Sequence, residues 1–200
     1  MPAQFVDPDV SRTKFNRELR EYRALEDQYR ARGWFLLDAK WPRVLVVMAA
    51  PQTRPPSIVA AVRFDYTNYD AMPPSVQIVN PFTLEPYRQR DLPTQMMRAV
   101  GPAPQVQGLP PGVVMAPMQQ PLLVAHGPDE VPFLCIAGVR EYHEHPAHSG
   151  DAWELHRADG AGRLVRILEV VSKYAVQPIN GFSVQLIPQT IGFSFGEIPQ

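Results

Sequence analysis

The sequence predicts an α+β fold in which an N-terminal helix precedes an antiparallel four-stranded meander, a metal-site loop and a C-terminal helix. Three observations support this prediction. Apolar residues recur at helical spacing near the N-terminus, four short apolar or β-branched runs follow with turn residues between them, and a second helical stripe lies toward the C-terminus. We expect a single domain over residues 1–200, with a proline-rich insertion or loop at about 101–121.

Residues 9–32 give the clearest helical pattern. Apolar side chains recur three and four positions apart at Phe15, Leu19, Tyr22, Leu25 and Tyr29. Asp9 or Ser11 can cap the start of this helix, and Gly33 can end it. Basic and acidic side chains are interleaved between the apolar positions, which favours a solvated face with internal ion pairs over a nucleic-acid patch.

After this helix the spacing of the apolar residues changes to that of strands. The four expected strands cover residues 34–38, 44–50, 58–66 and 76–80. Pro73 and Pro74 must interrupt any helix or sheet ladder between the last two strands. A C-terminal helix is expected over 164–175, with an apolar stripe at Leu164, Ile167, Leu168, Val171 and Ala175. Residues 182–187 and 191–195 suggest a final hairpin or an extended docking arm.

Composition limits the function classes. Of the 200 residues 45% are hydrophobic, and 19 basic against 20 acidic side chains leave a net charge of -1, which gives no electrostatic case for nucleic acid or an anionic membrane. One cysteine excludes an internal disulfide framework and suits a reducing compartment. The first residues lack the pattern of a secretory signal, and no apolar run has the length of a membrane span. We therefore expect a cytoplasmic protein.

The chemistry-bearing residues gather in one segment, 133–153. Five side chains within fourteen residues are of the types that bind divalent zinc, and these candidate metal ligands are Cys135, Glu141, His143, His145 and His148. The alternative interpretation is a small buried cysteine surrounded by surface histidines without a role. His126 and His156 stand outside the cluster, and we expect a loop residue at His126 and a residue of a strand or helix end at His156.

The spacing of the cluster suggests a geometry. Glu141, His143 and His145 are two residues apart, so in an extended segment they would share one face. Pro146 favours an extended conformation at the residue before it. The turn residues 149–151 could bring His148 back toward the same ion, and Cys135 would approach from an adjacent strand or loop. Asp151 could then accept a ring N–H from a ligating histidine.

This segment resembles a predicted metal-binding family of bacterial proteins named for its Cys, Glu, His, His signature. The resemblance is carried by Cys135, by Glu141 in Arg-Glu-Tyr-His, and by the run His-Pro-Ala-His-Ser-Gly-Asp-Ala-Trp over 145–153. It covers about the central third of the chain. The family stands beside bacterial ubiquitin-like conjugation genes, so the resemblance implies a bacterial accessory role in such a pathway. The preferred histidine pair is His145 and His148, with His143 left open.

The order of elements also resembles the ubiquitin-conjugating-enzyme fold and its inactive relatives. In that fold a helix precedes a four-stranded meander, a Pro-Pro-x-Val segment follows, and a cysteine-bearing loop leads to a tryptophan and further helices. Here the corresponding places are taken by residues 73–76, Cys135, Trp153 and the helix over 164–175. No His-Pro-Asn stands shortly before Cys135, and the interval from Cys135 to Trp153 is longer than the fold leads us to expect.

Three functions compete on this sequence. The first is a non-enzymatic accessory protein with a structural metal, zinc before iron or manganese, whose partner is a ubiquitin-like protein or its activating or conjugating enzymes. The second uses Cys135 as the nucleophile that accepts a ubiquitin-like protein as a thioester. The third is a zinc hydrolase in which Glu141 or Glu144 serves as general base.

Overall fold

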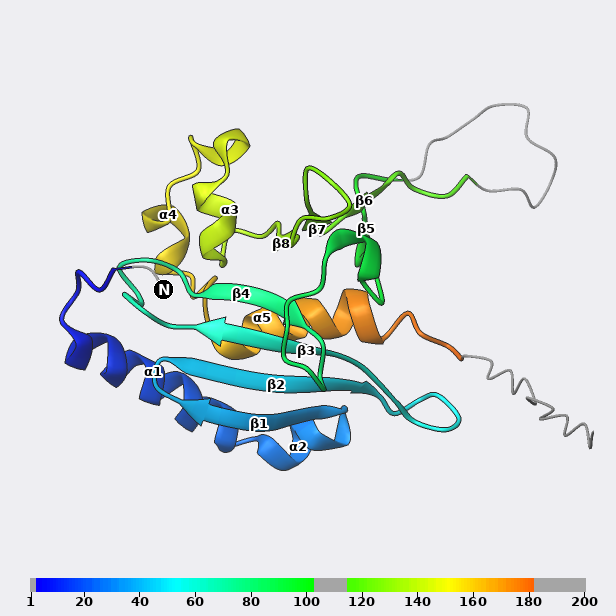
Figure 1. Cartoon of the computed structure of the whole chain (residues 1–200), viewed down its shortest axis with the longest axis horizontal. Helices are drawn as coiled ribbons and strands as arrows, with labels where there is room; N and C mark the ends of the chain where they lie inside the picture. Colours follow the sequence, from blue (N-terminus) through cyan, green and yellow to red (C-terminus); the bar gives the residue numbers. More distant parts are fainter. Residues whose placement is uncertain (1–2, 103–114, 182–200) are drawn as a thin grey trace, which may run out of the picture.

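The computed structural model describes residues 3–102 and 115–181. Its N-terminal half consists of two helices and an antiparallel four-stranded sheet in the order β1-β2-β3-β4 (Figure 1). The helices are α1 (Pro8–Arg23) and α2 (Glu26–Ala31), and the strands are β1 (Trp34–Lys40), β2 (Arg43–Ala50), β3 (Ser57–Asp65) and β4 (Ser75–Val79). The α+β class and the four-stranded meander are therefore confirmed.

The expected single helix over 9–32 is wrong in one respect, because it is broken into α1 and α2 at residues 24–25. Leu25 leaves the helical conformation with φ -125° and ψ 19°, and its side chain is exposed although it fits the apolar pattern. After the break, α2 lies against β1, where the Tyr29 ring stacks on the Trp34 ring with centroids 5.0 Å apart. This contact with the sheet outweighs the local helical pattern.

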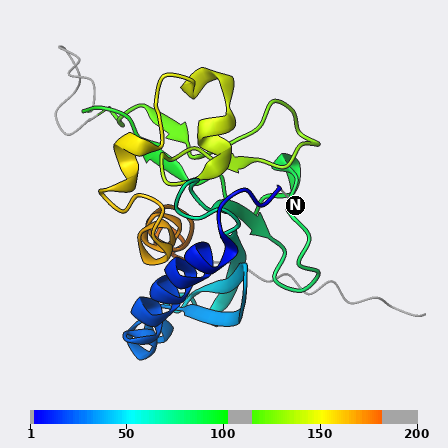
Figure 2. The ribbon, with the colours of Figure 1, turned by 90° about the vertical axis from the view of Figure 1, so that its left-hand side faces the viewer.

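One face of the sheet carries the core. Alternating residues of the strands, such as Val46 and Phe64, are buried against apolar residues of α1 and of α5 (Leu164–Val171). Figure 2 shows α1 and α5 side by side on this face. All five residues of the predicted C-terminal stripe are buried, and the helix continues as a π-helical turn over Ser172–Val176.

The remaining elements are short and lie beyond β4. They are β5 (Met97–Ala99), β6 (Gln119–Pro121), β7 (Leu123–Val124), β8 (Phe133–Leu134), α3 (Arg140–Glu144) and α4 (Glu154–Arg157), with 3-10 turns at Gln89–Asp91 and Pro146–His148. The pairs β5-β6 and β7-β8 form two-stranded sheets. Strands β5 and β6 flank the proline-rich stretch, of which 103–114 lies outside the described residues, as does the expected C-terminal hairpin. No helix in the described part is long and apolar enough to cross a membrane.

The buried carboxylate of Glu18 ties α1 to two other parts of the chain. It is 1% exposed, and it accepts hydrogen bonds from Arg17 Nη2 at 2.8 Å, from Tyr69 Oη at 3.2 Å and from the Leu164 backbone N–H at 3.1 Å. The last bond satisfies one of the free N–H groups at the start of α5. One side chain therefore fixes α1, the loop before β4 and α5 relative to one another.

Replacement of Glu18 by alanine should lower the free energy of unfolding by about 3 kcal/mol, because it leaves two buried donors without partners. Urea denaturation would measure this. Glu21→Ala is the matched control on the same helix, since that carboxylate is exposed and only reaches Arg163 at 3.9 Å. Equal losses in the two variants would contradict the anchoring role of Glu18.

Candidate functional site

The segment that carries the candidate ligands is helical where an extended conformation was expected. Residues Arg140–Glu144 form α3, and only His145 after it is extended, with φ -78° and ψ 130°. The helix is held by Arg140, whose backbone N–H donates to Pro74 O at 3.0 Å and whose buried guanidinium donates to Thr67 O at 2.5 Å. The shared face predicted for Glu141, His143 and His145 is therefore wrong.

The Glu141 carboxylate accepts hydrogen bonds from the start of β4. Its carboxylate accepts a hydrogen bond from the Ser75 hydroxyl and one of 3.3 Å from the Val76 backbone N–H. Burial raises the pKa of Glu141, while these hydrogen bonds lower it by less. Because both donors belong to the sheet, α3 directs Glu141 toward β4.

His143 is also engaged by the protein. Its Nδ1 lies 2.8 Å from the carbonyl oxygen of Asp151, and its Nε2 lies 2.6 Å from the carbonyl oxygen of Ala137. A carbonyl oxygen can only accept, so both ring nitrogens face acceptors. In this arrangement neither nitrogen is free for a metal, and the ring instead links the two ends of the 137–151 segment.

Cys135 and His148 form the one close pair among the candidate ligands in the described residues. The distance from Cys135 Sγ to His148 Nε2 is 3.5 Å. Cys135 follows β8, and its backbone N–H donates to Leu122 O at 2.7 Å. His148 ends the 3-10 turn, where the Tyr142 ring stacks on it with centroids 3.9 Å apart. Burial raises the pKa of the Cys135 thiol, and the charge of Arg98 partly opposes this.

His145 lies beside this pair. Its ring centroid is 5.6 Å from that of His148, 5.1 Å from Phe133 and 5.2 Å from His126, with which it is nearly parallel at 16°. Its Nδ1 accepts the Ala147 backbone N–H at 3.2 Å, and its Nε2 is buried without a hydrogen-bond partner. A buried polar atom without a partner is unusual and needs an explanation.

Over the described ranges, no three His, Cys, Asp or Glu side chains stand together in an arrangement that could hold a metal ion. The arrangement instead offers a thiol–imidazole pair, Cys135 with His148. His145 packs beside His148, and His126 stacks on His145. His126 lies in a loop, as expected. Sequence spacing gave no sign of its approach, because it depends on how residues 122–134 fold back beside α3.

Asp151 has partners other than those expected from the sequence. One of its carboxylate oxygens accepts the Tyr142 hydroxyl at 2.6 Å, and the other lies 2.5 Å from His156 Nε2. Burial, and then the bond to Asp151, raise the pKa of Tyr142 to about 12. Asp151 thus fixes the ring that stacks on His148, and His156, which belongs to α4, takes part in this support.

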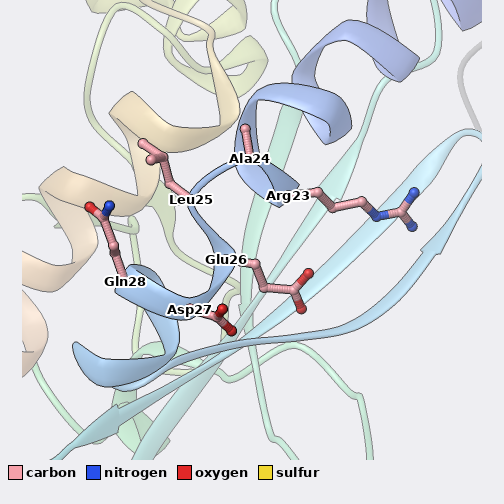
Figure 3. Close-up of a pocket in the computed structure, with 6 residues that line it drawn as sticks. All are labelled: Arg23, Ala24, Leu25, Glu26, Asp27 and Gln28. Atoms are coloured by element: carbon pink, nitrogen blue, oxygen red, sulfur yellow. The ribbon is translucent and has the colours of Figure 1, made fainter.

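Grooves lie along α1, its turn to α2, and α5. One of about 370 Å³ follows the turn between α1 and α2, where Arg23 and Glu26 project to one side and Leu25 and Gln28 to the other (Figure 3). A second of about 600 Å³ continues between this turn and α5. Neither includes a residue of the Cys135 cluster, so the two regions are separate features of the surface.

Comparison with known sequences gives one family. Residues 6–179 match the sequence model of the family described as Y4jH-like (Y4jH family). The chain is also similar to "Uncharacterized protein y4jH" of Sinorhizobium fredii (strain NBRC 101917 / NGR234), with 43% identity over 189 residues, which cover 92% of this chain and 90% of the relative. The matched range includes the sheet, α3 and the whole of the 133–153 segment.

Asp151 gives a pH test of the support around His148. The bonds from Tyr142 and then His156 lower the pKa of the Asp151 carboxyl. Its stabilisation is therefore present above the ordinary aspartate pKa, about 4, and is lost as pH falls through the lower pKa of the folded protein. Urea denaturation of metal-free protein should show Asp151→Asn less stable than the wild type above about pH 5, with the difference vanishing near about pH 2.

Asp159→Asn is the matched control, because Asp159 is exposed and its carboxylate makes no hydrogen bond in the described structure. It should leave the stability curve unchanged across the range. A difference between Asp151→Asn and the wild type that stays constant down to the lowest pH would show that the carboxylate charge is not what the two bonds stabilise.

Proposed function

We propose a metal-binding role for this chain, which belongs to the Y4jH-like family. The metal is zinc in this proposal, and the residues that would hold it are Cys135, His148 and His145. The observation that carries the proposal is the 3.5 Å contact between Cys135 Sγ and His148 Nε2. A thiolate and an imidazole are preferred zinc donors, and here they come from two different parts of the chain.

The donors fit this role to different degrees. His145 offers a buried Nε2 that has no protein partner. Coordination through this atom would place the ring proton on Nδ1 and break the bond from Ala147, a loss of about 1 kcal/mol. The apparent free energy of structural zinc binding is about 10 kcal/mol or more, so losing the bond from Ala147 would reduce the binding free energy only slightly. Glu141 and His143 are left out because their polar atoms already have partners within the protein.

The bound metal would be structural. It would join the end of β8 to the 3-10 turn after α3, and the free energy of binding would add to the stability of the fold. Tyr142, itself bonded to Asp151, would hold the His148 ring by stacking on it.

We further propose that the protein is an accessory of a bacterial ubiquitin-like conjugation pathway, on a scaffold of the ubiquitin-conjugating-enzyme type. What supports this is the resemblance of the 135–153 segment together with the order of elements. A helix, a four-stranded meander, Pro73-Pro74, Cys135, Trp153 and a final helix follow one another as in that fold. A ubiquitin-like protein or one of its activating or conjugating enzymes would be the partner.

A second function, thioester formation at Cys135, is favoured by one observation. His148 stands next to the thiol, where an imidazole could accept its proton. Burial raises the pKa of Cys135, which reduces the share of the reactive thiolate at neutral pH. The metal-binding function therefore remains the first choice, and the two functions exclude each other because a coordinated thiolate is not free to react.

Metal content separates the candidate ligands. Cys135→Ala and His148→Ala should purify with little zinc per chain, whereas Glu141→Gln should match the wild type, because Glu141 bonds Ser75 and Val76 instead. Plasma emission spectrometry of the purified variants would measure this. Zinc loss in Glu141→Gln as large as in His148→Ala would show that Glu141 is a ligand after all.

Chelation tests the structural role. Removing the metal with a strong chelator should lower the melting temperature by roughly 10 °C, and Cys135 should then react faster with an alkylating reagent. Cys135→Ala, which would have no metal to lose, is the control and should melt at the same temperature with or without chelator. A reducible adduct between the wild type and a ubiquitin-like protein charged by its activating enzyme would favour the thioester function.

A further inference from the structure

The face of the sheet that points away from the helices carries an apolar row of its own. Phe35, Val47, Ala61 and Val79 are direct neighbours across the four strands. Their side chains share this face, because paired residues of an antiparallel sheet point to the same side. Helices α1 and α5 cover the opposite face (Figure 2), so the row must be covered by other parts of the chain or by a partner.

One end of this row is already covered. The turn after β4 lies beside it, where Pro86 forms a bridge with Val79. In the same turn the Leu84 carbonyl oxygen accepts a hydrogen bond of 3.0 Å from Arg63, whose side chain belongs to this face of the sheet. Val79 and its neighbour Ala61 are accordingly buried.

The other end of the row is open to solvent. Phe35 and Leu37 of the edge strand β1 are 38% and 59% exposed, and Ile58 at the start of β3 is 53% exposed. Ile58 pairs with Ala49, whose side chain lies on the same face as that of Val47 two residues earlier. These three exposed side chains, Phe35, Leu37 and Ile58, are called the outer apolar surface below.

The chain beyond Ile179 starts close to this surface. Gln52, in the turn between β2 and β3, donates hydrogen bonds of 2.9 Å to the carbonyl oxygens of Val176 and Ile179. Ile58 follows the same turn as the second residue of β3. The residues after Ile179 therefore continue from the end of the sheet at which Ile58 lies.

The sequence that follows is apolar and almost uncharged. Residues 182–200 contain one charged side chain, Glu197. They contain eight large apolar ones, which are Phe182, Val184, Leu186, Ile187, Ile191, Phe193, Phe195 and Ile198. Segments that stay in solvent are typically poor in such residues and rich in charge. The composition therefore indicates that this part of the chain is buried against a partner surface.

The first residues of this stretch alternate between apolar and polar. Phe182, Val184 and Leu186 are separated by Ser183 and Gln185. In an extended conformation the three apolar side chains share one side and the two polar ones share the other. A segment of this kind fits a surface that is apolar and lies on one side of it only.

We propose that the 182–187 segment docks on the outer apolar surface and covers it. The distance across the strands from Ile58 to Phe35 is two strand spacings, about 10 Å, and an extended chain covers about 13 Å from Phe182 to Leu186. The segment is thus long enough to cross the sheet from β3 to β1. Its apolar side faces the sheet, and its polar side faces solvent.

The main alternative occupant is a second copy of the chain. A dimer through this face would leave the apolar residues after Ile179 without a cover of their own. The 182–187 segment is joined to Ile179 by two residues, so its effective concentration at the surface is about millimolar or higher at any dilution. The segment of the same chain therefore competes well with a second molecule.

Photo-crosslinking of the full chain tests this proposal. Phe35 is replaced by the photoreactive amino acid benzoylphenylalanine, which keeps an aromatic ring at the exposed position and links on irradiation to what lies against it. Mass spectrometry of the digested protein should find the link in the 182–187 segment. The same probe at Leu155 is the matched control, because Leu155 is exposed on α4, outside the sheet, and should give no link to that segment.

Two charge substitutions test which side of the segment faces the sheet. Val184→Asp should lower the yield of the link at Phe35 at least about fivefold, because docking would bury a charge. Gln185→Asp is its matched control, since it places the same charge on the opposite side of the segment, and it should keep the wild-type yield. Circular dichroism should show the same fold in both variants. Equal losses of yield would contradict the docking of the apolar side.

A mixture of isotope-labelled and unlabelled protein identifies the chain that supplies the linked peptide. We expect links within one isotopic species only. Links between labelled and unlabelled peptides would show that a second copy covers Phe35 and would overturn the proposal. Links to another part of the same chain, or no peptide link at all, would also overturn it. None of these results depends on metal content, so the proposed function stands or fails separately.

Discussion

The docking of α3 on the start of β4 is the constraint on which the candidate site depends. Arg140 donates its backbone N–H to Pro74 O and its guanidinium to Thr67 O. The Glu141 carboxylate accepts hydrogen bonds from the Ser75 hydroxyl and the Val76 N–H. Glu141 points at the sheet, while His145 and His148 follow the end of the helix. The same contacts thus occupy one candidate ligand, and the turn after the helix brings His148 to 3.5 Å from Cys135.

This docking needs a fixed platform, and Glu18 supplies part of it. Through Tyr69 the Glu18 carboxylate holds the loop between β3 and β4, and through the Leu164 N–H it holds the first turn of α5. Trp153 completes the connection, since its indole N–H donates to Asp70 O at 2.8 Å. The segment between Cys135 and Trp153 is therefore held at both ends, at Trp153 by Asp70 and at Cys135 by Leu122.

The helices and strands of the core could be predicted from the sequence, whereas the local geometry of the site could not. Two core helices and four strands follow from apolar spacing alone, because burial on one face determines them. The spacing of two between Glu141, His143 and His145 suggested a strand, but a five-residue segment takes its conformation from its contacts, here those of Arg140. The strands β5 and β6 and the approach of His126 were missed for a related reason, since they depend on long-range pairing of short, weakly patterned pieces.

The nature of the Cys135 pair bears on which chemistry the site favours. A nucleophilic cysteine needs surroundings that stabilise the thiolate, such as a nearby cation or a helix N-terminus. At Cys135 burial raises the pKa, and the charge of Arg98 opposes this only in part. A thiol of this kind would lose its proton to solvent most readily when a metal ion binds the sulfur, because the ion supplies the positive charge that the surroundings lack. In the proposed site His148, on which Tyr142 stacks, would be a second donor to the ion rather than a base for the thiol.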